Sequence, residues 1–333
     1  MNKKLVTGLV IVASVAVTIF AGCVDNLPRP MSPPSSTSTP SPPHPSTPSP
    51  IVTPTTTPIP SPSPSPLSNV SEEETLRIGA FNLQIFGTTK ASKPEVMDVL
   101  GKIIRTYDVV AVQEIRDASQ TALPALVDIV NSEGSQYGYV VSERLGRTTS
   151  KEQYAYIYNN QTVRIVGAPQ TYPEPEGTDP FHKEPYTASF KALNGNFDFT
   201  LITIHTDPDE ATEEINALDE VVKYAPNMYQ DELDFVVMGD LNADCSYFDE
   251  DSTSTLSGGD YYWCINNSVD TTTKTTDCTY DRIIITDAAV SDFTGDAGVF
   301  RYDIEYGLTA DETTAVSDHY PVYAEFWSGR DMD

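Results

Sequence analysis

From residue 75 onward, short apolar segments of strand length alternate with segments in which apolar residues recur every three or four positions. Residues 76–83 and 108–115 are apolar runs typical of buried strands. Between them, Ser92 indicates a helix start of the capping-box kind, and the apolar helix face that follows continues to Tyr107. The pattern therefore predicts a strand, a helix and a strand at the start of this region.

The strand pattern returns at residues 197–205, 234–239, 280–286 and 320–327. A helical pattern over residues 209–224 separates the first two, and no repeat of fixed period appears. Strands that alternate with helices indicate a mixed α/β fold. Residues 75–333 suffice for one domain at the upper end of what a single core usually serves.

The preceding residues have a different composition. Residues 28–66 contain 16 of the 26 prolines, with serine and threonine filling most other positions, so they cannot bury a core. Such a segment favours polyproline II, which rises about 3.1 Å per residue. We expect a disordered stalk at residues 24–74 and a folded domain at residues 75–333.

Residues 1–23 are typical of an export signal. Lys3 and Lys4 precede an uncharged run, and Phe20-Ala21-Gly22-Cys23 resembles the lipobox at which lipoprotein precursors are cut. We expect cleavage before Cys23, lipidation of that cysteine and an extracellular domain held at the cell surface. An uncleaved membrane anchor is the alternative, and it also places the domain outside.

The formal net charge of −28 belongs almost entirely to the folded part, where 17 Lys and Arg face 44 Asp and Glu. Such a charge argues against non-specific duplex binding through a basic face, because affinity for nucleic acid normally comes from phosphate neutralisation. It suits divalent cations instead. An acidic groove that a bound metal neutralises is the exception that still admits nucleic acid.

Polar residues stand at the ends of the apolar strands in five places. These are Phe81-Asn82, Gln113-Glu114, His205, Gly-Asp-Leu-Asn-Ala-Asp at 239–244 and Ser-Asp-His-Tyr-Pro at 317–321. Each alone is most simply a cap or a turn. Together their carboxylates and amides supply the hard oxygen ligands that Mg²⁺ and Ca²⁺ require, and the two histidines titrate near neutral pH.

This set meets the needs of phosphodiester cleavage. The reaction requires an activated water, a group that protonates the leaving oxygen, positive charge at the phosphorane and in-line geometry. A histidine can act as acid or base when a carboxylate holds it in one tautomer, and Glu152 and Asp281 are candidate partners. For His205 and His319, the plainer alternative is a satisfied core histidine.

Seven segments together resemble the deoxyribonuclease I family of the endonuclease/exonuclease/phosphatase superfamily, in that family's order and spacing. They are residues 81–87, 107–110, 113–117, 139–143, 239–247, 278–282 and 317–321. The wider superfamily shares the Asn, Glu, Asp-x-Asn and Asp-His positions but not Asn-Ala-Asp-Cys-Ser-Tyr at 242–247. The resemblance covers residues 76–327.

The resemblance implies a four-layered α/β sandwich, with two mainly antiparallel sheets packed face to face, helices outside and an active site at one sheet edge. It implies two hydrogen-bonded acid–base pairs, Glu152 with His205 and Asp281 with His319. The positions that bind the catalytic Mg²⁺ or Mn²⁺, or contact the scissile phosphate, are Asn82, Glu114, Asp240, Asn242 and Asp318. The implied substrate contacts are Arg116, which enters the minor groove in the family, Lys151, Lys183 and Tyr280.

Structural Ca²⁺ and a disulfide are also implied by the resemblance. The matching calcium positions are Asp270, Thr272 and Thr276 for one site, and Asp179, the Phe181 carbonyl and Glu184 for most of another. A polar threonine-rich loop is the plainer interpretation of the first. Cys245 and Cys278 match the family's larger disulfide, whereas its second, short-loop disulfide is absent. We expect Cys264 to be a buried thiol.

Two departures from the family bear on duplex DNA. Ser150 stands where the family has a tyrosine that stacks in the minor groove. Lys183 replaces a phosphate-binding arginine, which exchanges a bidentate fork for a point charge. A local basic set remains, made of Arg116, Arg144, Arg147, Lys151, Lys183, Lys274 and Arg282.

We therefore expect a monomeric, extracellular, divalent-metal-dependent endonuclease that hydrolyses DNA to 5′-phosphate products. One alternative is a phosphodiesterase that acts on RNA, nucleotides or phospholipid head groups. Another is a binding protein without turnover, since the family's actin-binding face includes positions that match Tyr139 and Val141. The intact ligand set argues against the binding protein, and we expect no actin binding.

Overall fold

The computed structural model describes residues 74–230 and 232–332. The predicted export signal, the lipidation of Cys23 and the stalk up to residue 73 lie outside the described residues. Within residues 74–230 and 232–332, no helix is long and apolar enough to span a bilayer.

Two six-stranded sheets form the centre of the domain. The first has the order β11 (Phe293–Val299), β12 (Val322–Trp327), β1 (Thr75–Phe86), β2 (Val109–Ile115), β4 (Gln153–Asn159), β3 (Tyr137–Val141). The second has the order β5 (Val163–Thr171), β6 (Tyr186–Ala192), β7 (Asp198–His205), β8 (Phe235–Asp240), β10 (Asp281–Thr286), β9 (Tyr261–Trp263). One pair in each sheet is parallel, β1 with β2 and β7 with β8, and the other neighbours are antiparallel.

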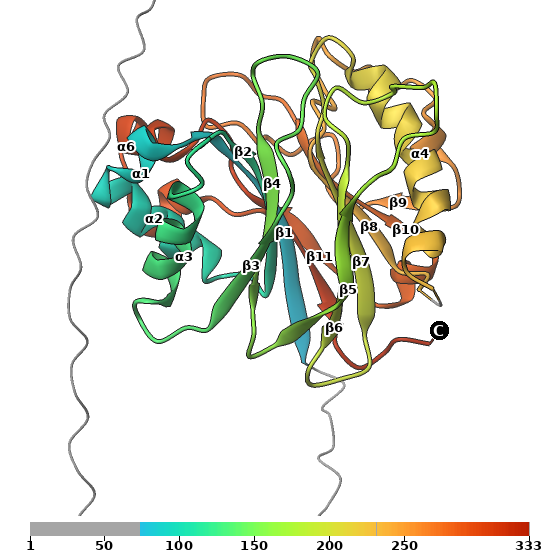
Figure 1. The fold of residues 1–333 in the computed structure, drawn as a ribbon, viewed down its shortest axis with the longest axis horizontal. Coiled ribbons are helices and arrows are strands. Elements are labelled where there is room, and N and C mark those ends of the chain that lie inside the picture. The colour runs from blue at the N-terminus through green and yellow to red at the C-terminus, as the bar shows by residue number, and fades with distance from the viewer. Residues whose placement is uncertain (1–73, 231, 333) are drawn as a thin grey trace, which may run out of the picture. The chain divides into compact units, whose positions relative to one another are not determined.

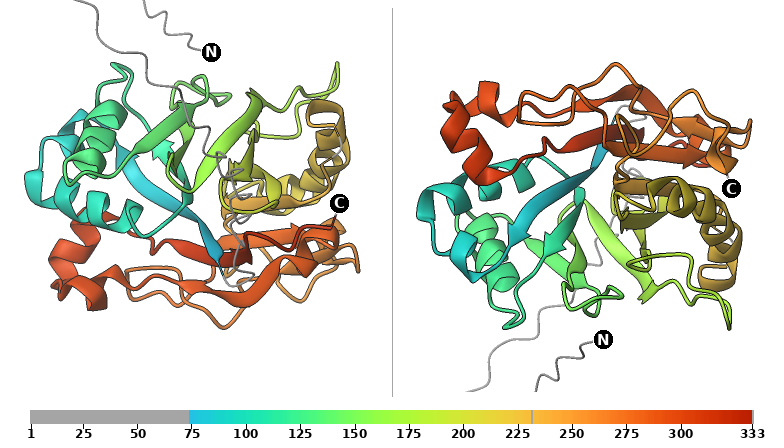
Figure 2. Two further views of the ribbon diagram at one scale, coloured as in Figure 1. Left: turned by 90° about the horizontal axis from the view of Figure 1, so that it is seen from below. Right: turned by 90° about the horizontal axis from the view of Figure 1, so that it is seen from above.

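Helices cover the outer face of each sheet (Figure 1). Those on the first sheet are α1 (Thr88–Ala91), α2 (Pro94–Ile104), α3 (Ala122–Asn131), α5 (Tyr302–Tyr306) and α6 (Ala310–Val316). The second sheet is covered by α4 (Ala211–Met228) and a 3₁₀ turn at Thr255–Ser257, and a second 3₁₀ turn spans Ala288–Ser291. The two further views show the same layers, helix, sheet, sheet and helix (Figure 2).

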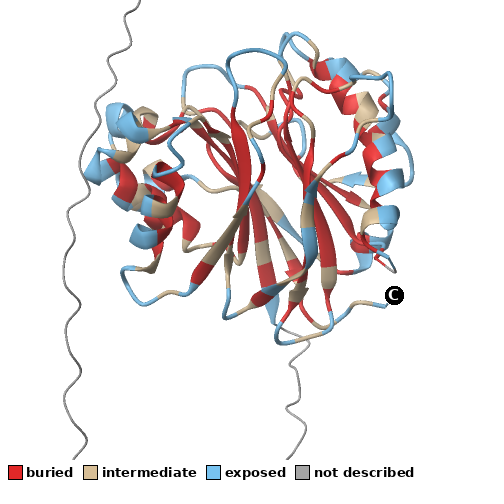
Figure 3. Cartoon of the chain, viewed as in Figure 1, coloured by how far each residue is buried: buried red, intermediate tan, exposed pale blue. Residues whose placement is uncertain are grey.

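Three apolar clusters hold these layers together. The cluster between the sheets includes Phe190, Phe199 and Phe326, and the two outer clusters pack the helices on the sheets. The central strands are therefore buried on both faces, as the red strands of Figure 3 show. This double burial explains why their sequences are continuous apolar runs rather than alternating ones.

The predicted α/β sandwich is confirmed, and each predicted strand lies within a few residues of an observed one. The predicted helix start is wrong in detail. α2 begins at Pro94 with Lys93 as its N-cap, and no side chain caps it. Ser92 instead donates from Oγ to the Thr89 carbonyl at 2.8 Å, at the end of α1. Pro94 needs no cap for its own nitrogen, because a proline at the first helical position has no N–H.

Candidate active site

Polar strand ends meet at one edge of the two sheets, the upper edge in Figure 1. β1, β2, β7 and β8 end there, while β4, β10 and β12 begin there. The register places Asn82 beside Gln113. It also places Asp240 between His205 and Asp281. Residues far apart in the sequence are therefore neighbours because of how the strands pair.

His205 and Glu152 form a buried pair. His205 Nδ1 lies 2.8 Å from Glu152 Oε1, and the His205 N–H donates to the Tyr154 hydroxyl at 3.0 Å. Burial alone would lower the pKa of His205, but the Glu152 carboxylate outweighs it and raises that pKa. Burial would raise the pKa of Glu152, but His205 outweighs it and lowers that pKa. Each group of the pair therefore favours the charged form of the other.

His319 and Asp281 form a second pair of the same kind. His319 Nδ1 lies 2.8 Å from Asp281 Oδ2. Burial opposes the charge, but the carboxylates of Asp281 and Asp240 outweigh it and raise the pKa of His319 to about 10. The structure therefore brings together both predicted acid–base pairs.

The two imidazoles converge on one carboxylate oxygen. Asp240 Oδ2 lies 3.6 Å from His205 Nε2 and 3.5 Å from His319 Nε2. Asn82 Nδ2 donates to the same oxygen at 2.9 Å. Because each Nδ1 is held by its own carboxylate, each Nε2 is the ring atom left to exchange protons at this common point.

The backbone around these groups adopts conformations that most residues avoid. Glu114 and Asn242 have φ values of 59° and 46°. Gly239 has φ 137°, and a Cβ there would lie 2.0 Å from the Ile204 carbonyl oxygen. Left-handed non-glycine residues persist only where the surroundings hold them, and they cluster at functional sites. No hydrophobic pattern in the sequence could have indicated them.

The site's oxygen atoms fit a divalent cation. Asn82 Nδ2 lies 3.3 Å from Glu114 Oε1, so the carboxylates of Glu114 and Asp240 flank one amide. Ligand atoms of Asp240, Asp281 and His319 lie within 4.8 Å of one another. This group offers two carboxylate oxygens and one imidazole nitrogen, and carboxylate oxygens are the ligands that Mg²⁺ and Mn²⁺ prefer.

Two further predicted metal-binding residues have other partners. The Asn242 N–H donates to Asp240 Oδ1 at 3.2 Å, and its side-chain amide donates to the Thr206 carbonyl at 3.0 Å. Asp318 Oδ2 forms an ion pair of 2.8 Å with Lys274 Nζ. Both residues border the site, but their nearest contacts are within the protein.

The predicted substrate contacts lie at different depths. Arg116 is half-buried and donates to Ser150 Oγ at 3.2 Å. Its guanidinium also forms an ion pair of 3.1 Å with Glu114 Oε2. Lys183 is buried, with 6% of its surface exposed, whereas Lys151 is exposed. The Tyr280 ring lies 6.2 Å from the His319 ring, centroid to centroid. Arg116 therefore lies beside the Glu152–His205 pair and Tyr280 beside His319.

Both predicted calcium loops gather oxygen atoms. In the first, Thr272 Oγ1 donates to Asp270 Oδ1 at 2.8 Å and lies 2.5 Å from the Thr276 carbonyl oxygen. In the second, Glu174 accepts the Phe181 N–H at 3.2 Å. Burial raises the pKa of Glu174, and the nearby Asp179 and Glu184 carboxylates raise it further.

Glu174 was missed as a member of the second loop. It is one of several acidic residues in the segment, and only the fold-back of residues 174–184 shows which of them meet. Asp179 Oδ2 is also paired with Arg147 Nε at 3.0 Å.

Cysteine and arginine near the site have structural roles. Cys245 and Cys278 form the predicted disulfide. Cys264, which we expected to be buried, is a half-buried free thiol, and desolvation raises its pKa to about 12. Arg282, which we expected in the basic set around the groove, is instead fully buried. Its guanidinium donates to the Ala243 carbonyl at 2.8 Å and to Glu250 at 2.7 Å, which anchors the loop after β8.

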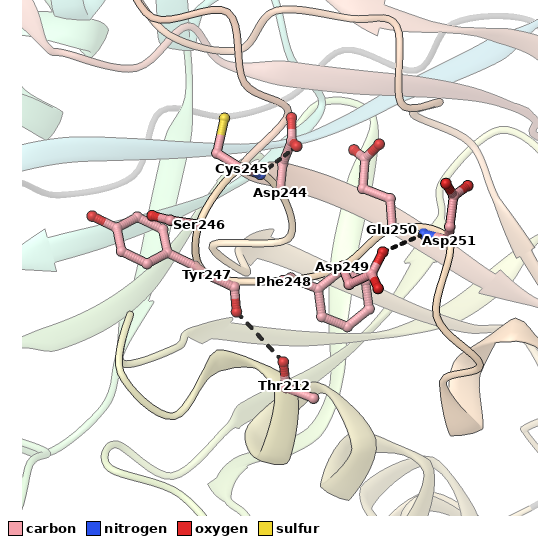
Figure 4. A pocket seen from close by; sticks show the side chains of 9 residues that line it. All are labelled: Thr212, Asp244, Cys245, Ser246, Tyr247, Phe248, Asp249, Glu250 and Asp251. Carbon is pink, nitrogen blue, oxygen red and sulfur yellow. Dashed lines mark hydrogen bonds between the residues drawn. The ribbon is translucent and has the colours of Figure 1, made fainter.

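A hollow of about 490 Å³ lies beside the disulfide and is lined by Thr212 and residues 244–251 (Figure 4). None of the residues that line it belongs to the histidine pairs. Two of its aspartates accept hydrogen bonds from backbone N–H groups in turns. Asp244 accepts the backbone N–H groups of Cys245 and Thr279, and Asp249 accepts the Asp251 N–H at 3.2 Å. This hollow is therefore a loop surface rather than the catalytic centre.

Known proteins are similar to this chain in sequence and in fold. A family model described as the endonuclease/exonuclease/phosphatase family matches residues 79–319. Deoxyribonuclease-1 from Bos taurus is 35% identical over 257 residues, which cover 74% of this chain and 91% of that protein. Deoxyribonuclease gamma from Homo sapiens is 34% identical over 275 residues, 79% and 90% of the two chains.

Among solved structures, an endonuclease/exonuclease/phosphatase family protein from Bacteroides thetaiotaomicron is similar in fold. Its TM-score is 0.54 at 17% identity, with 76% of this chain and 97% of that chain covered.

Proposed function

Because the chain belongs to the endonuclease/exonuclease/phosphatase family, as a deoxyribonuclease I-like member, we propose that it is a divalent-metal-dependent endonuclease that hydrolyses DNA to 5′-phosphate products. The observation that carries this proposal is the convergence of the His205 and His319 Nε2 atoms on Asp240 Oδ2, at 3.6 and 3.5 Å. The relatives named Deoxyribonuclease-1 and Deoxyribonuclease gamma support DNA as the substrate.

The two histidines divide the proton transfers. With Nδ1 donating to its carboxylate, a neutral imidazole has a lone pair on Nε2 and takes a proton from the attacking water. A protonated imidazole in the same pose has a proton on Nε2 and gives it to the leaving 3′ oxygen. Glu152 and Asp281 fix the tautomer and orientation of His205 and His319 for these roles.

The proposed ligands of the catalytic ion are Glu114 and Asp240, with Asn82 between them. When bound there, Mg²⁺ or Mn²⁺ supplies positive charge to the phosphate oxygens. The protein's part is to hold the carboxylate oxygens of Glu114 and Asp240 in place, and the left-handed backbone at Glu114 contributes to this.

We also propose that the domain works outside the cell as a monomer, attached through a lipid on Cys23, with structural Ca²⁺ in the loops at 270–276 and 174–184. The support is the signal-like sequence of residues 1–23 and a disulfide, which persists in oxidising compartments.

The ends of the products test the proposed bond cleavage. A duplex oligonucleotide digested with Mg²⁺ and Ca²⁺ should yield 5′-phosphate and 3′-hydroxyl ends by mass spectrometry. Fragments with 3′-phosphate ends would show that the other ester bond is cut.

Competition among substrates tests the choice of DNA. Ser150 and Lys183, which depart from the family, motivate comparing duplex DNA with single strands, RNA and a small diester in one reaction. We expect duplex DNA to be consumed first, and preferential loss of RNA or the small diester would favour the alternative phosphodiesterase.

A further inference from the structure

Lys274 reaches the active site from a loop on the His319 side. Its side chain is 57% exposed, and its Nζ lies 2.8 Å from Asp318 Oδ2. The other oxygen of Asp318 lies 3.9 Å from His319 Nε2, the atom that exchanges protons in the proposed reaction. One carboxylate therefore separates the Lys274 ammonium from the reacting centre.

The backbone that bears Lys274 is fixed to the catalytic strand end. The Thr273 N–H donates to the Asp318 carbonyl at 2.9 Å, and Thr273 Oγ1 donates to the Ser317 carbonyl at 2.9 Å. Thr272 and His319 form a β-bridge. Because the main chain is held while the side chain is exposed, the ammonium can move over a short range without leaving the site.

Other cations on this side are already engaged. Lys274 and Arg301 both line a hollow of about 280 Å³. The Arg301 guanidinium, however, pairs with both Asp303 oxygens, at 2.9 and 2.7 Å. Lys90 Nζ donates to the Leu83 and Val316 carbonyls at 2.8 and 2.9 Å. Lys274 is thus an exposed cation on this side whose partner is a carboxylate at the site itself.

The charge of the site calls for such a cation. The carboxylates at the site, which repel an approaching polyanion, are those of Glu114, Glu152, Asp240, Asp281 and Asp318. Beside the Glu152–His205 pair, Arg116 offers positive charge. Lys274 offers it on the Asp318 side, so positive charges border the histidines from two directions.

We propose that Lys274 binds a backbone phosphate of the nucleic-acid substrate next to the scissile bond, on the Asp318 side. This inference rests on the proposed function and deepens it. In the free protein Asp318 holds the ammonium at the edge of the site, and in the complex the phosphate oxygen becomes its partner. The role is substrate binding, so it acts on affinity rather than on proton transfer.

Binding and its salt dependence test the role of Lys274. A fluorescent DNA duplex is titrated in Ca²⁺ with the full chain carrying His205→Ala, with and without Lys274→Gln. Lys223→Gln is the matched control, because Lys223 is 61% exposed and pairs with Asp219 at 2.6 Å on α4. Circular dichroism and the Tm of each variant confirm that it is folded.

We expect Lys274→Gln to weaken binding on the order of tenfold, as for loss of one charge-assisted contact. Raising the salt from 50 to 200 mM should weaken the variant's binding about 3-fold less than the parent's, since one phosphate contact contributes a slope of about 0.9. In the active enzyme, KM should rise with kcat nearly unchanged, and Lys274→Arg should restore KM.

Three results would overturn the inference. The first is a Kd and salt slope equal to those of Lys223→Gln, and the second is a fall in kcat at constant KM. The third is failure of Lys274→Arg to restore KM. If instead the unmodified protein neither binds nor cuts duplex DNA, the proposed function itself fails, and the two failures are therefore distinguishable.

Discussion

Asp240 is surrounded by protein donors. Both imidazole Nε2 atoms and the Asn82 amide face one of its oxygens, and the Asn242 N–H donates to the other. Burial would raise its pKa, but the charges of His319 and His205 outweigh burial and lower it. A carboxylate kept ionised at this position can hold a divalent ion while it keeps the two imidazoles in place.

Glu214, on α4, shows the opposite balance and yields a pH prediction. It is fully buried and accepts the His182 N–H at 2.9 Å. Burial raises its pKa from 4.5 to about 7. Between these values the native state binds more protons than the unfolded state, so stability falls as pH rises through this window and is constant above it.

Glu214→Gln should remove this fall. From pH 4.5 to 8, the free energy of unfolding of the parent should decrease relative to the variant by on the order of 3 kcal/mol. Urea unfolding of both proteins at several pH values measures the difference. Parallel curves for the two proteins would mean that Glu214 ionises normally in the fold.

At the scale of elements, each histidine–carboxylate pair bridges the two sheets. His205 ends β7 of the second sheet, whereas Glu152 directly precedes β4 of the first. Asp281 begins β10 of the second sheet, and His319 precedes β12 of the first. The pairs therefore form only when the sheets pack, which couples the site to the central core.

This coupling also explains what the sequence could and could not predict. Strand patterns placed Glu114 and Asp240 at strand ends correctly, because burial of both strand faces produces apolar runs that stop at polar residues. Asn82 instead lies inside β1, which continues to Phe86 after a break in the register. Which histidine meets which carboxylate depends on contacts between distant segments, and here the family resemblance, not periodicity, supplied the pairing. The burial of Arg282 could not be predicted from the residue type, because arginine is rarely buried unless it is paired.

The disulfide yields a prediction at this scale. Cys245, after β8, and Cys278, before β10, are 33 residues apart, and they join the two segments that lead to Asp240 and Asp281. Replacing both cysteines by serine should lower the free energy of unfolding by roughly 3 to 4 kcal/mol, the loop-closure value for this length. Denaturant unfolding measures it, and a change below about 1 kcal/mol would contradict the chain-entropy explanation.

The proposed calcium loops at 270–276 and 174–184 yield a second prediction at this scale. Ca²⁺ at about 100 times its Kd should add about 2.7 kcal/mol per site to the free energy of unfolding, and EDTA should remove it. Asp270→Ala and Asp179→Ala should each abolish part of this gain, measured as the change in Tm with added Ca²⁺. If both variants gain as much as the parent, the loops are not calcium sites.

At the scale of the whole molecule, the strong negative charge distinguishes this chain from proteins that bind DNA through a basic surface. The folded part carries 44 acidic residues against 17 basic ones. Arg116 and Lys274, two cations at the edge of the site, are paired with acidic residues in the free protein. Affinity for DNA should therefore depend on divalent ions as well as on these side chains, because the ions offset the carboxylates of the site.

Conversion of supercoiled plasmid tests the central claim, that His205 and His319 act with a divalent ion to cut DNA. With Mg²⁺ and Ca²⁺ the protein should nick and then linearise the plasmid, and EDTA should stop the reaction. His205→Ala and His319→Ala, each folded by circular dichroism, should each lower the rate by about 10²-fold or more. Near-parental rates in both variants, or unchanged nicking in EDTA, would contradict the claim.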